Sequence, residues 1–491
     1  MIDRDASMGP DGLTRRDRDL IRDVLARYPE VRRVTLFGSR AMGTFGRGSD
    51  IDLALEGRDL DSSTLTRIAT ELEDSDLPYK VDLLLRDEQL EPKLEAHIRR
   101  HGKPFGWERS TWGEEISLEY GKSLKDYSDA TSGFRVFGTN GPIGWTDKPI
   151  AAGPGVILGR KGAYRGVHFS PNPFFVIDTA YYVVPKTELD MHWLYYAMIH
   201  YQLGQIDDGS PIPSTTRAAV YPREIVVPPL DEQHNISRAL GALDDKIEQN
   251  RRTAQALEQL ARAIFRAWFV DFEPIKAKAA GATAFPSMPQ PVFDALPTIF
   301  TDSAIGPVPE GWSVVRLDDI LTLQRGFDLP KQSRNDGSHP IFASSGMSGR
   351  HSEWKVRGPG VTTGRSGMLG QVFFVDRDFW PLNTSLWVKE YKRSNPWHAY
   401  FLLQTLDLAQ FNAGSAVPTL NRNHVHSLPR VAAPDYLLAA FGQMCDSTFS
   451  LEQQLRIESD RIATIRDYLL PKLLSGQIRV RDAERSAGAV A

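Results

Sequence analysis

Apolar side chains recur with a spacing of four and three residues over two long stretches of this chain. From Asp231 onward they fall at Ile236, Leu240, Leu243, Ile247, Ala254, Leu257, Ala261, Ile264 and Trp268. This spacing predicts one helix over about 231–270, with Asn250 as the single polar residue in its apolar stripe. A second stretch, Leu451 to Leu469, has similar spacing and is interrupted by Glu458. Two such stripes predict two long helices that pack against each other.

The first hundred residues show the two-residue period of β-strands instead. In DIDLAL (50–55), Asp50, Asp52 and Ala54 share one face, and the intervening Ile and Leu residues share the other. Side chains two positions apart lie on the same face of a strand, so both carboxylates project together. VTLF (34–37) predicts a buried strand that ends at Gly38-Ser39, and YKVDLLL (79–85) predicts a strand that carries Asp82. Helices are expected over 16–29, 63–74 and 88–100.

The rest of the chain is an internal duplication. At an offset of 205 residues without a gap, PGV at 154–156 aligns with PGV at 359–361, and GRKG at 159–162 aligns with GRSG at 364–367. Glycine and proline restrict backbone geometry, so their agreement in one register predicts matching turns. Each copy has about 125 residues of short strands and turns followed by one long helix. Two copies are too few for a solenoid.

Length and composition agree with a folded multidomain protein. A chain of 491 residues is too long for one core, and no segment is apolar enough to span a membrane. The charged start is not a signal peptide, and a single cysteine fits a reducing cytoplasm, so a cytoplasmic location without membrane contact is expected. The net charge of −4 excludes a uniformly basic coat.

The predicted domain organisation follows from the strands, the duplication and the helices. Its parts are a first domain (1–105), a first repeat (106–230), a central helix (231–275), a linker (276–305), a second repeat (306–435), a C-terminal helix (436–480) and a disordered tail (481–491). Within the linker, the composition of KAKAAGATAFPSMPQ (276–290) predicts an extended conformation.

The order G-S, D-x-D and a third Asp on a later strand resembles the minimal nucleotidyltransferases of the polymerase-beta-like superfamily, over residues 15–105. The resemblance implies that Asp50, Asp52 and Asp82 bind Mg²⁺ and that Gly38 and Ser39 hold a nucleoside triphosphate. A nucleoside monophosphate would then pass to an acceptor. The alternative is a catalytically silent domain that only docks a partner, so whether this chain is an enzyme stays open.

Residues 105–480 resemble the specificity subunit of type I restriction–modification systems. VPPLDEQHNISRALGALDDKIEQNRRTAQALEQLARAIFRAWF (227–269), VPEGWSVVRLDDI (308–320) and LLPKLLSGQI (469–478) carry this resemblance. Together the two resemblances imply an α+β multidomain fold: a small α/β nucleotidyltransferase domain, then two mixed α/β target recognition domains, each followed by a long helix. The two helices would pack as an antiparallel coiled coil.

The same resemblance implies partners in a defence against foreign DNA. They are double-stranded DNA with a bipartite site, two methyltransferase subunits and restriction/motor subunits. NPFF (172–175) lacks the second proline of the amino-methyltransferase signature, and GPGVTTGRS (358–366) has the wrong glycine spacing for a P-loop. S-adenosylmethionine and ATP would therefore be used by the partner subunits. The alternative function is nucleotidyl transfer to a protein or RNA, as in antitoxin-like relatives, targeted to DNA by the repeats.

Residues that contact DNA are expected in the glycine-bounded loops, because acidic residues slightly outnumber basic ones in the first repeat. Cations there can bind phosphates and amides can read base edges. The candidates are Arg160, Lys161, Arg165, Arg350, Arg357, Arg365, Asn421 and Arg422. Arg160 and Arg365 occupy equivalent positions, so either DNA contact or bracing of a shared turn would explain them.

Overall fold

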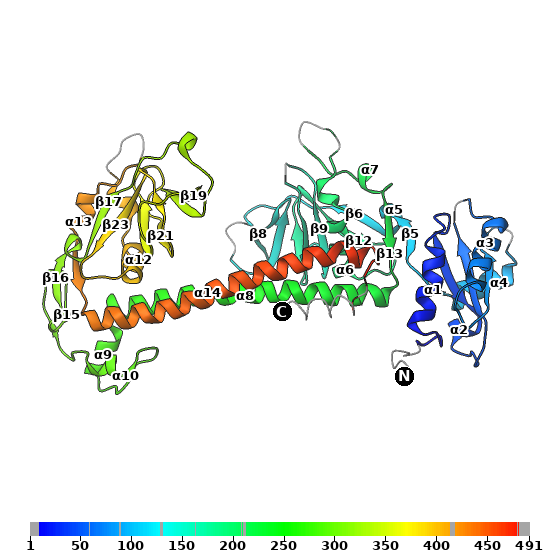
Figure 1. Cartoon of the computed structure of the whole chain (residues 1–491), viewed down its shortest axis with the longest axis horizontal. Helices are drawn as coiled ribbons and strands as arrows, with labels where there is room; N and C mark the ends of the chain where they lie inside the picture. The colour runs from blue at the N-terminus through cyan, green and yellow to red at the C-terminus, as the bar shows by residue number, and fades with distance from the viewer. Residues whose placement is uncertain are drawn as a thin grey trace. The chain divides into compact units, whose positions relative to one another are not determined.

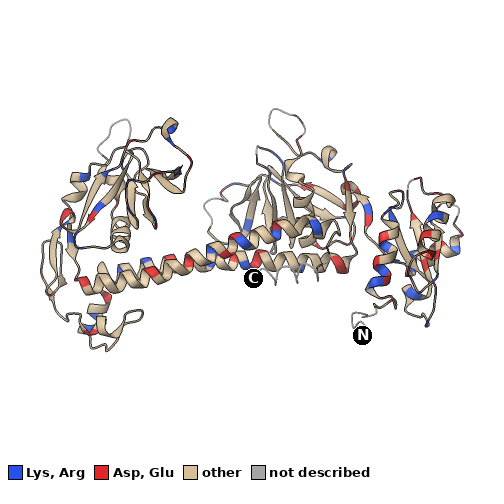
Figure 2. Ribbon diagram, in the orientation of Figure 1, with Lys and Arg blue, Asp and Glu red and all other residues tan. Residues whose placement is uncertain are grey.

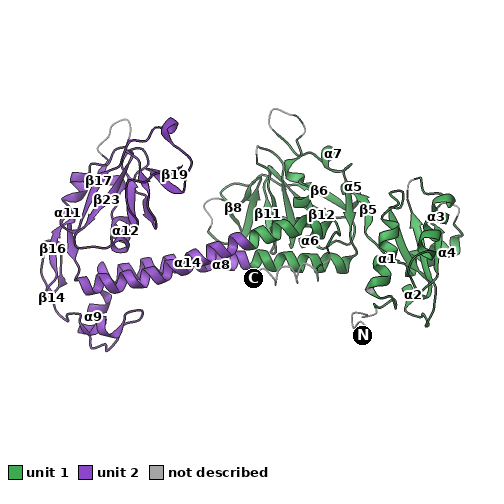
Figure 3. Ribbon diagram, in the orientation of Figure 1, with its two compact units in different colours: residues 1–245, 462–491 green, residues 246–461 purple. Residues whose placement is uncertain are grey.

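The structure is a computed structural model of the whole chain. It describes residues 9–57, 59–87, 90–127, 131–162, 164–207, 209, 213–412, 418–478 and 480. The predicted tail, 481–491, lies outside the described residues. Contact clustering divides the chain into unit 1, residues 1–245 and 462–491, and unit 2, residues 246–461 (Figure 3).

The N-terminal domain is a four-stranded sheet with helices, in the strand order β3-β2-β1-β4. Its elements are α1 (Arg15–Leu25), β1 (Arg33–Phe37), α2 (Gly38–Met42), β2 (Ile51–Glu56), α3 (Ser62–Glu73), β3 (Val81–Leu85), α4 (Pro92–His101) and β4 (Lys103–Pro104). The strand β2 pairs antiparallel with β1 and parallel with β3. Ile51, Leu53 and Leu55 are fully buried, as the alternation in DIDLAL predicts.

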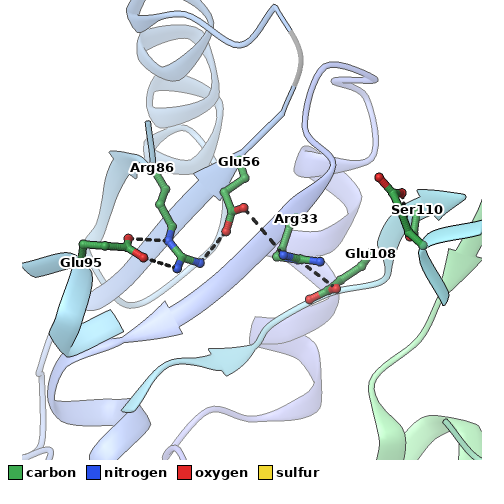
Figure 4. Close-up of polar contacts among 7 residues, drawn as sticks. Arg33, Glu56, Arg86, Glu95, Glu108 and Ser110 are labelled. Carbon is green, nitrogen blue, oxygen red and sulfur yellow. Dashed lines mark hydrogen bonds and ion pairs between the residues drawn. The ribbon is translucent and has the colours of Figure 1, made fainter. Parts of the chain in front are cut away.

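The chain passes from this domain into the first repeat within three residues. Phe105, directly after β4, is 1% exposed and belongs to the N-terminal core. An alternating series of charges follows the same path: Arg86 pairs with Glu56, Glu56 with Arg33, and Arg33 with Glu108 on the next strand (Figure 4). The N-terminal domain and the first repeat are therefore joined by a packed junction within unit 1.

The first repeat is built from three small sheets and several short helices. Its elements are β5 (Glu108–Thr111), α5 (Trp112–Glu115), β6 (Ile116–Tyr120), β7 (Phe134–Gly138), β8 (Gly141–Thr146), β9 (Gly155–Gly159), β10 (Val167–Ser170), β11 (Phe174–Val176), β12 (Ala180–Pro185), α6 (Met191–His200), η1 (Leu203–Gln205), α7 (Arg217–Val220) and β13 (Glu224–Val227). The sheets have the orders β10-β9-β12-β6, β11-β7-β8 and β13-β5.

The second repeat has the same topology. Its elements are β16 (Ser313–Arg316), α11 (Leu317–Ile320), β17 (Leu321–Arg325), η2 (Lys331–Ser333), β18 (His339–Ala343), β19 (Gly346–His351), β20 (Gly360–Gly364), β21 (Val372–Val375), β22 (Trp380–Pro381), β23 (Ser385–Tyr391), α12 (Pro396–Gln404), η3 (Leu408–Phe411), α13 (Arg422–His426) and β24 (Pro429–Ala432). The sheets β21-β20-β23-β17, β22-β18-β19 and β24-β16 repeat those of the first copy. The predicted duplication is confirmed.

Each repeat is followed by a helix of 40 residues, α8 (Leu230–Phe269) and α14 (Asp435–Leu474) (Figure 1). At 1.5 Å per residue, each is about 60 Å long. Within unit 1, Asp244 of α8 pairs with Arg466 of α14, and within unit 2, Asn250 donates to Glu458 at 2.8 Å. Residue numbers rise along one helix as they fall along the other, so the predicted antiparallel pairing is confirmed. Lys and Arg are interspersed with Asp and Glu along both helices (Figure 2).

The two polar interruptions of the apolar stripes meet each other. Asn250 is 2% exposed, and its Nδ2 also lies 3.5 Å from the carbonyl oxygen of Leu455, the residue 205 positions later. Asn250 therefore faces its own equivalent in the duplication. A buried amide needs a hydrogen-bond partner, and Glu458 supplies it.

The extended conformation predicted for 276–290 is wrong for the start of that segment. The chain instead forms α9 (Glu273–Ala279) and α10 (Gln290–Asp294), followed by the strand pair β14 (Phe300–Thr301) and β15 (Val308–Pro309). Met288 within the segment is 9% exposed, and Ile275 and Phe293 on either side of it are each 1% exposed; all three join the core of unit 2. This burial of apolar surface stabilises the local helices.

Among the described residues, no helix is both long and apolar enough to cross a bilayer.

Candidate functional site

The Gly-Ser turn of the N-terminal domain begins the short helix α2. Gly38 has φ of +69°, and a Cβ at this position would lie 2.2 Å from Oδ2 of Asp52. Only glycine therefore allows the turn to come so close to the carboxylate. Ser39 follows on the same turn and is partly exposed.

Two of the three predicted acids are neighbours across paired strands. Asp52 on β2 is the register partner of Asp82 on β3, and the strands are parallel, so both side chains lie on the same face. Asp50 is exposed and directly precedes β2. Burial and repulsion from Asp82 and Asp50 raise the pKa of Asp52. The fold thus brings the three carboxylates into one electrostatic cluster.

A lysine shares this cluster. Lys80 Nζ lies 2.6 Å from Oδ1 of Asp82, and this contact raises the pKa of Lys80. In the described part of the chain, no group of three or more His, Cys, Asp or Glu side chains is arranged to hold a metal ion. The oxygen donors suit a hard divalent cation, but Asp82 would have to exchange Lys80 for it.

The loop that carries Asp50 is held by a buried arginine that the motif analysis did not select. Arg40 is 1% exposed, and its guanidinium donates to the carbonyl oxygens of Ser49, Asp50 and Asp11. It also lies 4.4 Å from the centre of the Tyr79 ring. Its position directly after Gly-Ser was the available signal, but sequence does not show that its donors face inward.

Several of the predicted DNA-contacting arginines are bound by the protein itself. Arg165 donates to Thr215 Oγ1 and to the carbonyl oxygens of Gly162 and Ile206. Arg160 lies over the ring of Tyr120 at 5.0 Å, and Arg365 donates to the carbonyl oxygen of Asn383. These side chains brace the duplicated turn.

The remaining candidates are more accessible. Lys161 and Arg357 are exposed, and Arg350 is exposed while donating to the carbonyl oxygen of Ser338. Arg422 is exposed and lies 3.5 Å from the carbonyl oxygen of Leu323.

Asn421 caps α13 by accepting a hydrogen bond from the backbone N–H of Asn423. Its side-chain oxygen is therefore already used in local structure.

Comparison with known families assigns both parts of the chain. Residues 120–259 and 309–429 match the family model described as "Type I restriction modification DNA specificity domain", and residues 19–105 match "Polymerase beta, Nucleotidyltransferase". The first model covers both repeats, and the second covers the domain that carries the three aspartates.

Individual relatives agree with the family match. The MjaIX type I restriction enzyme specificity subunit of Methanocaldococcus jannaschii is 24% identical over 363 residues, which cover 67% of this chain and 78% of that protein. The HindI specificity subunit of Haemophilus influenzae is 24% identical over 330 residues, covering 54% and 71%.

Among solved structures, the S subunit of the type I restriction–modification system from M. genitalium matches with a TM-score of 0.51 and 17% identity. The match covers 75% of this chain and 96% of that one, and it concerns the fold alone.

Proposed function

Because the chain belongs to the family of type I restriction–modification DNA specificity proteins, we propose that it selects a bipartite site on double-stranded DNA for partner subunits. Two methyltransferase subunits with S-adenosylmethionine and ATP-driven restriction/motor subunits would supply the chemistry. The observation that carries this proposal is the duplication: two readers of one topology, each followed by a 40-residue helix of the antiparallel pair.

This architecture suits a split site for a physical reason. Sequence is read by side chains that reach base edges, while contacts with phosphates only position the protein. One reader covers a few base pairs, so two readers in one chain select two short segments with unread base pairs between them. Exposed cations of the readers, including Lys161 and Arg357, are the proposed phosphate contacts.

Methylation mapping tests this function. The full chain would be co-expressed with its cognate type I methyltransferase subunit, and methylated adenines would be mapped over a host genome that lacks other methylation. The expected result is one motif of two short specified segments separated by a spacer of fixed length. A contiguous motif, or no methylation from a complex that assembles, would refute the proposal.

For the N-terminal domain we propose Mg²⁺-dependent transfer of a nucleoside monophosphate to a protein or RNA acceptor. Asp50, Asp52 and Asp82 would hold the metal, and Gly38 and Ser39 would bind phosphate oxygens. A bound divalent cation would neutralise charge on the triphosphate. The close approach of Gly38 to Asp52 and the raised pKa of Asp52, which burial and repulsion from Asp82 and Asp50 cause, support this assignment, because clustered carboxylates favour cation binding.

Labelled nucleotides test the transfer activity. The full chain would be incubated with Mg²⁺, each α-labelled nucleoside triphosphate and the co-purifying subunits and RNA. The double variant Asp50→Ala/Asp52→Ala is expected to lose the label. The exposed acid Asp74, which directly follows α3, offers a matched control as Asp74→Ala. Equal labelling by the double variant and the wild type would refute catalysis by these residues.

A further inference from the structure

We propose that the two repeats, which act as the two readers of the DNA site, contact base edges at equivalent positions of their shared fold. Side chains that differ between the repeats at these positions would make the two half-sites differ. In the first reader these positions lie at a hollow of about 530 Å³ lined by Asn140, Tyr164, His168 and Gln205, together with Arg165, Gly166 and Gly204. The inference rests on the proposed DNA-reading function and names the residues that carry it.

Three segments form the hollow. Asn140 lies in the turn between β7 and β8, Tyr164 lies in the loop before β10, and Gln205 ends η1. All three side chains are exposed, and Tyr164 reaches 80% exposure. Exposure of a large aromatic ring next to amide side chains is typical of a surface that contacts a partner.

The frame of the hollow is the same in both readers. The turn glycine Gly141 has φ of +108°, and a Cβ there would lie 3.1 Å from the ring of His168. Its equivalent, Gly346, has φ of +103°, and a Cβ there would lie 3.1 Å from the ring of Phe373. Backbone and ring position are thus repeated, and the chemical nature of the ring is not.

The side chains that line the frame differ in polarity. At the positions of Asn140, Tyr164 and His168, the second reader has Ser345, Leu369 and Phe373. Two exposed methionines flank these positions, Met347 at 61% and Met368 at 49% exposure. Gln205 has a glutamine equivalent, Gln410, which is also exposed.

This contrast matches the chemistry of base edges. Asparagine and glutamine can form paired hydrogen bonds with adenine in the major groove, and apolar side chains contact the methyl group of thymine. Nε2 of His168 is buried beneath Gly166 without a hydrogen-bond partner among the described residues, so the ring forms part of the wall of the hollow. Asn140 and Gln205 of the hollow therefore suit polar base edges, and the apolar side chains of the second reader at positions equivalent to the hollow suit an apolar one.

Arg165 forms a fixed side of the hollow and does not act as a base reader. Its three hydrogen bonds to Thr215, Gly162 and Ile206 occupy its guanidinium and hold the loop. The neighbouring uncharged side chains are therefore the ones proposed to determine specificity. A search of the sequence for basic residues would not find them.

A graft between the readers tests the inference. The triple variant Asn140→Ser/Tyr164→Leu/His168→Phe gives the first hollow the residues found at the equivalent positions of the second reader, where phenylalanine already lies beside the turn glycine. The full chain would be co-expressed with the methyltransferase subunit, and its methylated motif would be mapped. Asn172→Ser, a change at an exposed asparagine of the same reader between β10 and β11, is the matched control.

The expected result is a change confined to one half of the motif, with preference at one or more positions relaxed by about tenfold or more in relative methylation. An unchanged motif, or equal changes in both halves, would overturn the inference. If the triple variant does not methylate at all, the single exposed changes Asn140→Ser and Gln205→Ala decide the question, and an unaltered motif in both overturns it.

The methylation motif of the wild type tests the proposed function independently of the hollow. A wild-type motif that is not bipartite contradicts DNA selection by two readers. A bipartite wild-type motif that the variants leave unchanged contradicts only the assignment of the hollow.

Discussion

Replacement of Arg40 by alanine is expected to destabilise the nucleotidyltransferase domain by about 4 kcal/mol. The guanidinium makes hydrogen bonds at 3.1 and 2.6 Å to the carbonyl oxygen of Ser49, at 3.1 Å to that of Asp50 and at 3.0 Å to that of Asp11. Removing one buried partner costs about 1–3 kcal/mol for each group left unsatisfied, and water can enter part of the vacated space. Three carbonyl groups at about 1 kcal/mol each, and about 1 kcal/mol from the contact with the Tyr79 ring, give the total.

Hydrogen exchange measured by mass spectrometry on the full chain resolves this loss, because it reports each domain separately. About 4 kcal/mol corresponds to a roughly 1000-fold loss of protection in peptides that cover β1 and β2. Arg47→Ala is the matched control, since Arg47 lies on the same loop and is exposed. Arg40→Lys should give an intermediate loss, because lysine keeps the charge but not the planar set of donors.

A loss below about 1 kcal/mol, or one equal to that of Arg47→Ala, would refute the reasoning. Arg40 would then not hold the loop that carries Asp50. Peptides from the two readers serve as an internal reference and should keep their protection.

Three further predictions concern charges and buried polar groups. The pKa of Asp52 is raised in the folded state, so ionisation of Asp52 destabilises the fold as the pH rises from about 3.8. Asp52→Asn should therefore raise the melting temperature of the domain at pH 7 but not below pH 3. Equal changes in melting temperature at both pH values would contradict this. The substitution Arg86→Met, at a side chain that is 20% exposed, should lower the free energy of unfolding by about 2 kcal/mol. Arg33→Met, at a side chain that is 45% exposed, should lower it by less than about 1 kcal/mol. Hydrogen exchange compares the stability losses of the two variants. A larger loss for Arg33→Met than for Arg86→Met would refute the view that the more buried arginine contributes more. Glu458→Ala and Asn250→Ala should show a coupling of about 1 kcal/mol in a double-mutant cycle by denaturant unfolding, and additive losses would show that the 2.8 Å hydrogen bond is unimportant.

Features that depend on neighbours in sequence were predictable. The alternation in β2 placed Asp52 on the open face, because a strand repeats every two residues. The four-three spacing placed the first long helix, predicted over about 231–270, within one residue of its observed ends, Leu230–Phe269. The second helix, predicted over 436–480, runs over Asp435–Leu474 and ends six residues earlier. The duplication was visible because its glycines and prolines keep one register, and the structure repeats every strand order at the same offset.

Features that depend on distant partners were not predictable. The segment 276–290 has an alanine- and proline-bearing composition typical of a linker, yet its first residues belong to α9 and its Met288 packs in the core of unit 2. Arginines posed the same difficulty. Arg165 and Lys161 are both basic residues of one loop, but only the structure shows that the donors of Arg165 are satisfied by protein oxygens while Lys161 is exposed.

By itself, the amino-acid sequence determined the secondary structure periods, the duplication, the three aspartates and both family resemblances, because each is a local or repeated pattern. Tertiary structure alone decided which polar groups remain free for a ligand and which are used to hold the fold. Hydrogen-bond partners such as Asn250 and Glu458 lie 208 residues apart, and spacing along the chain carries no record of such pairs.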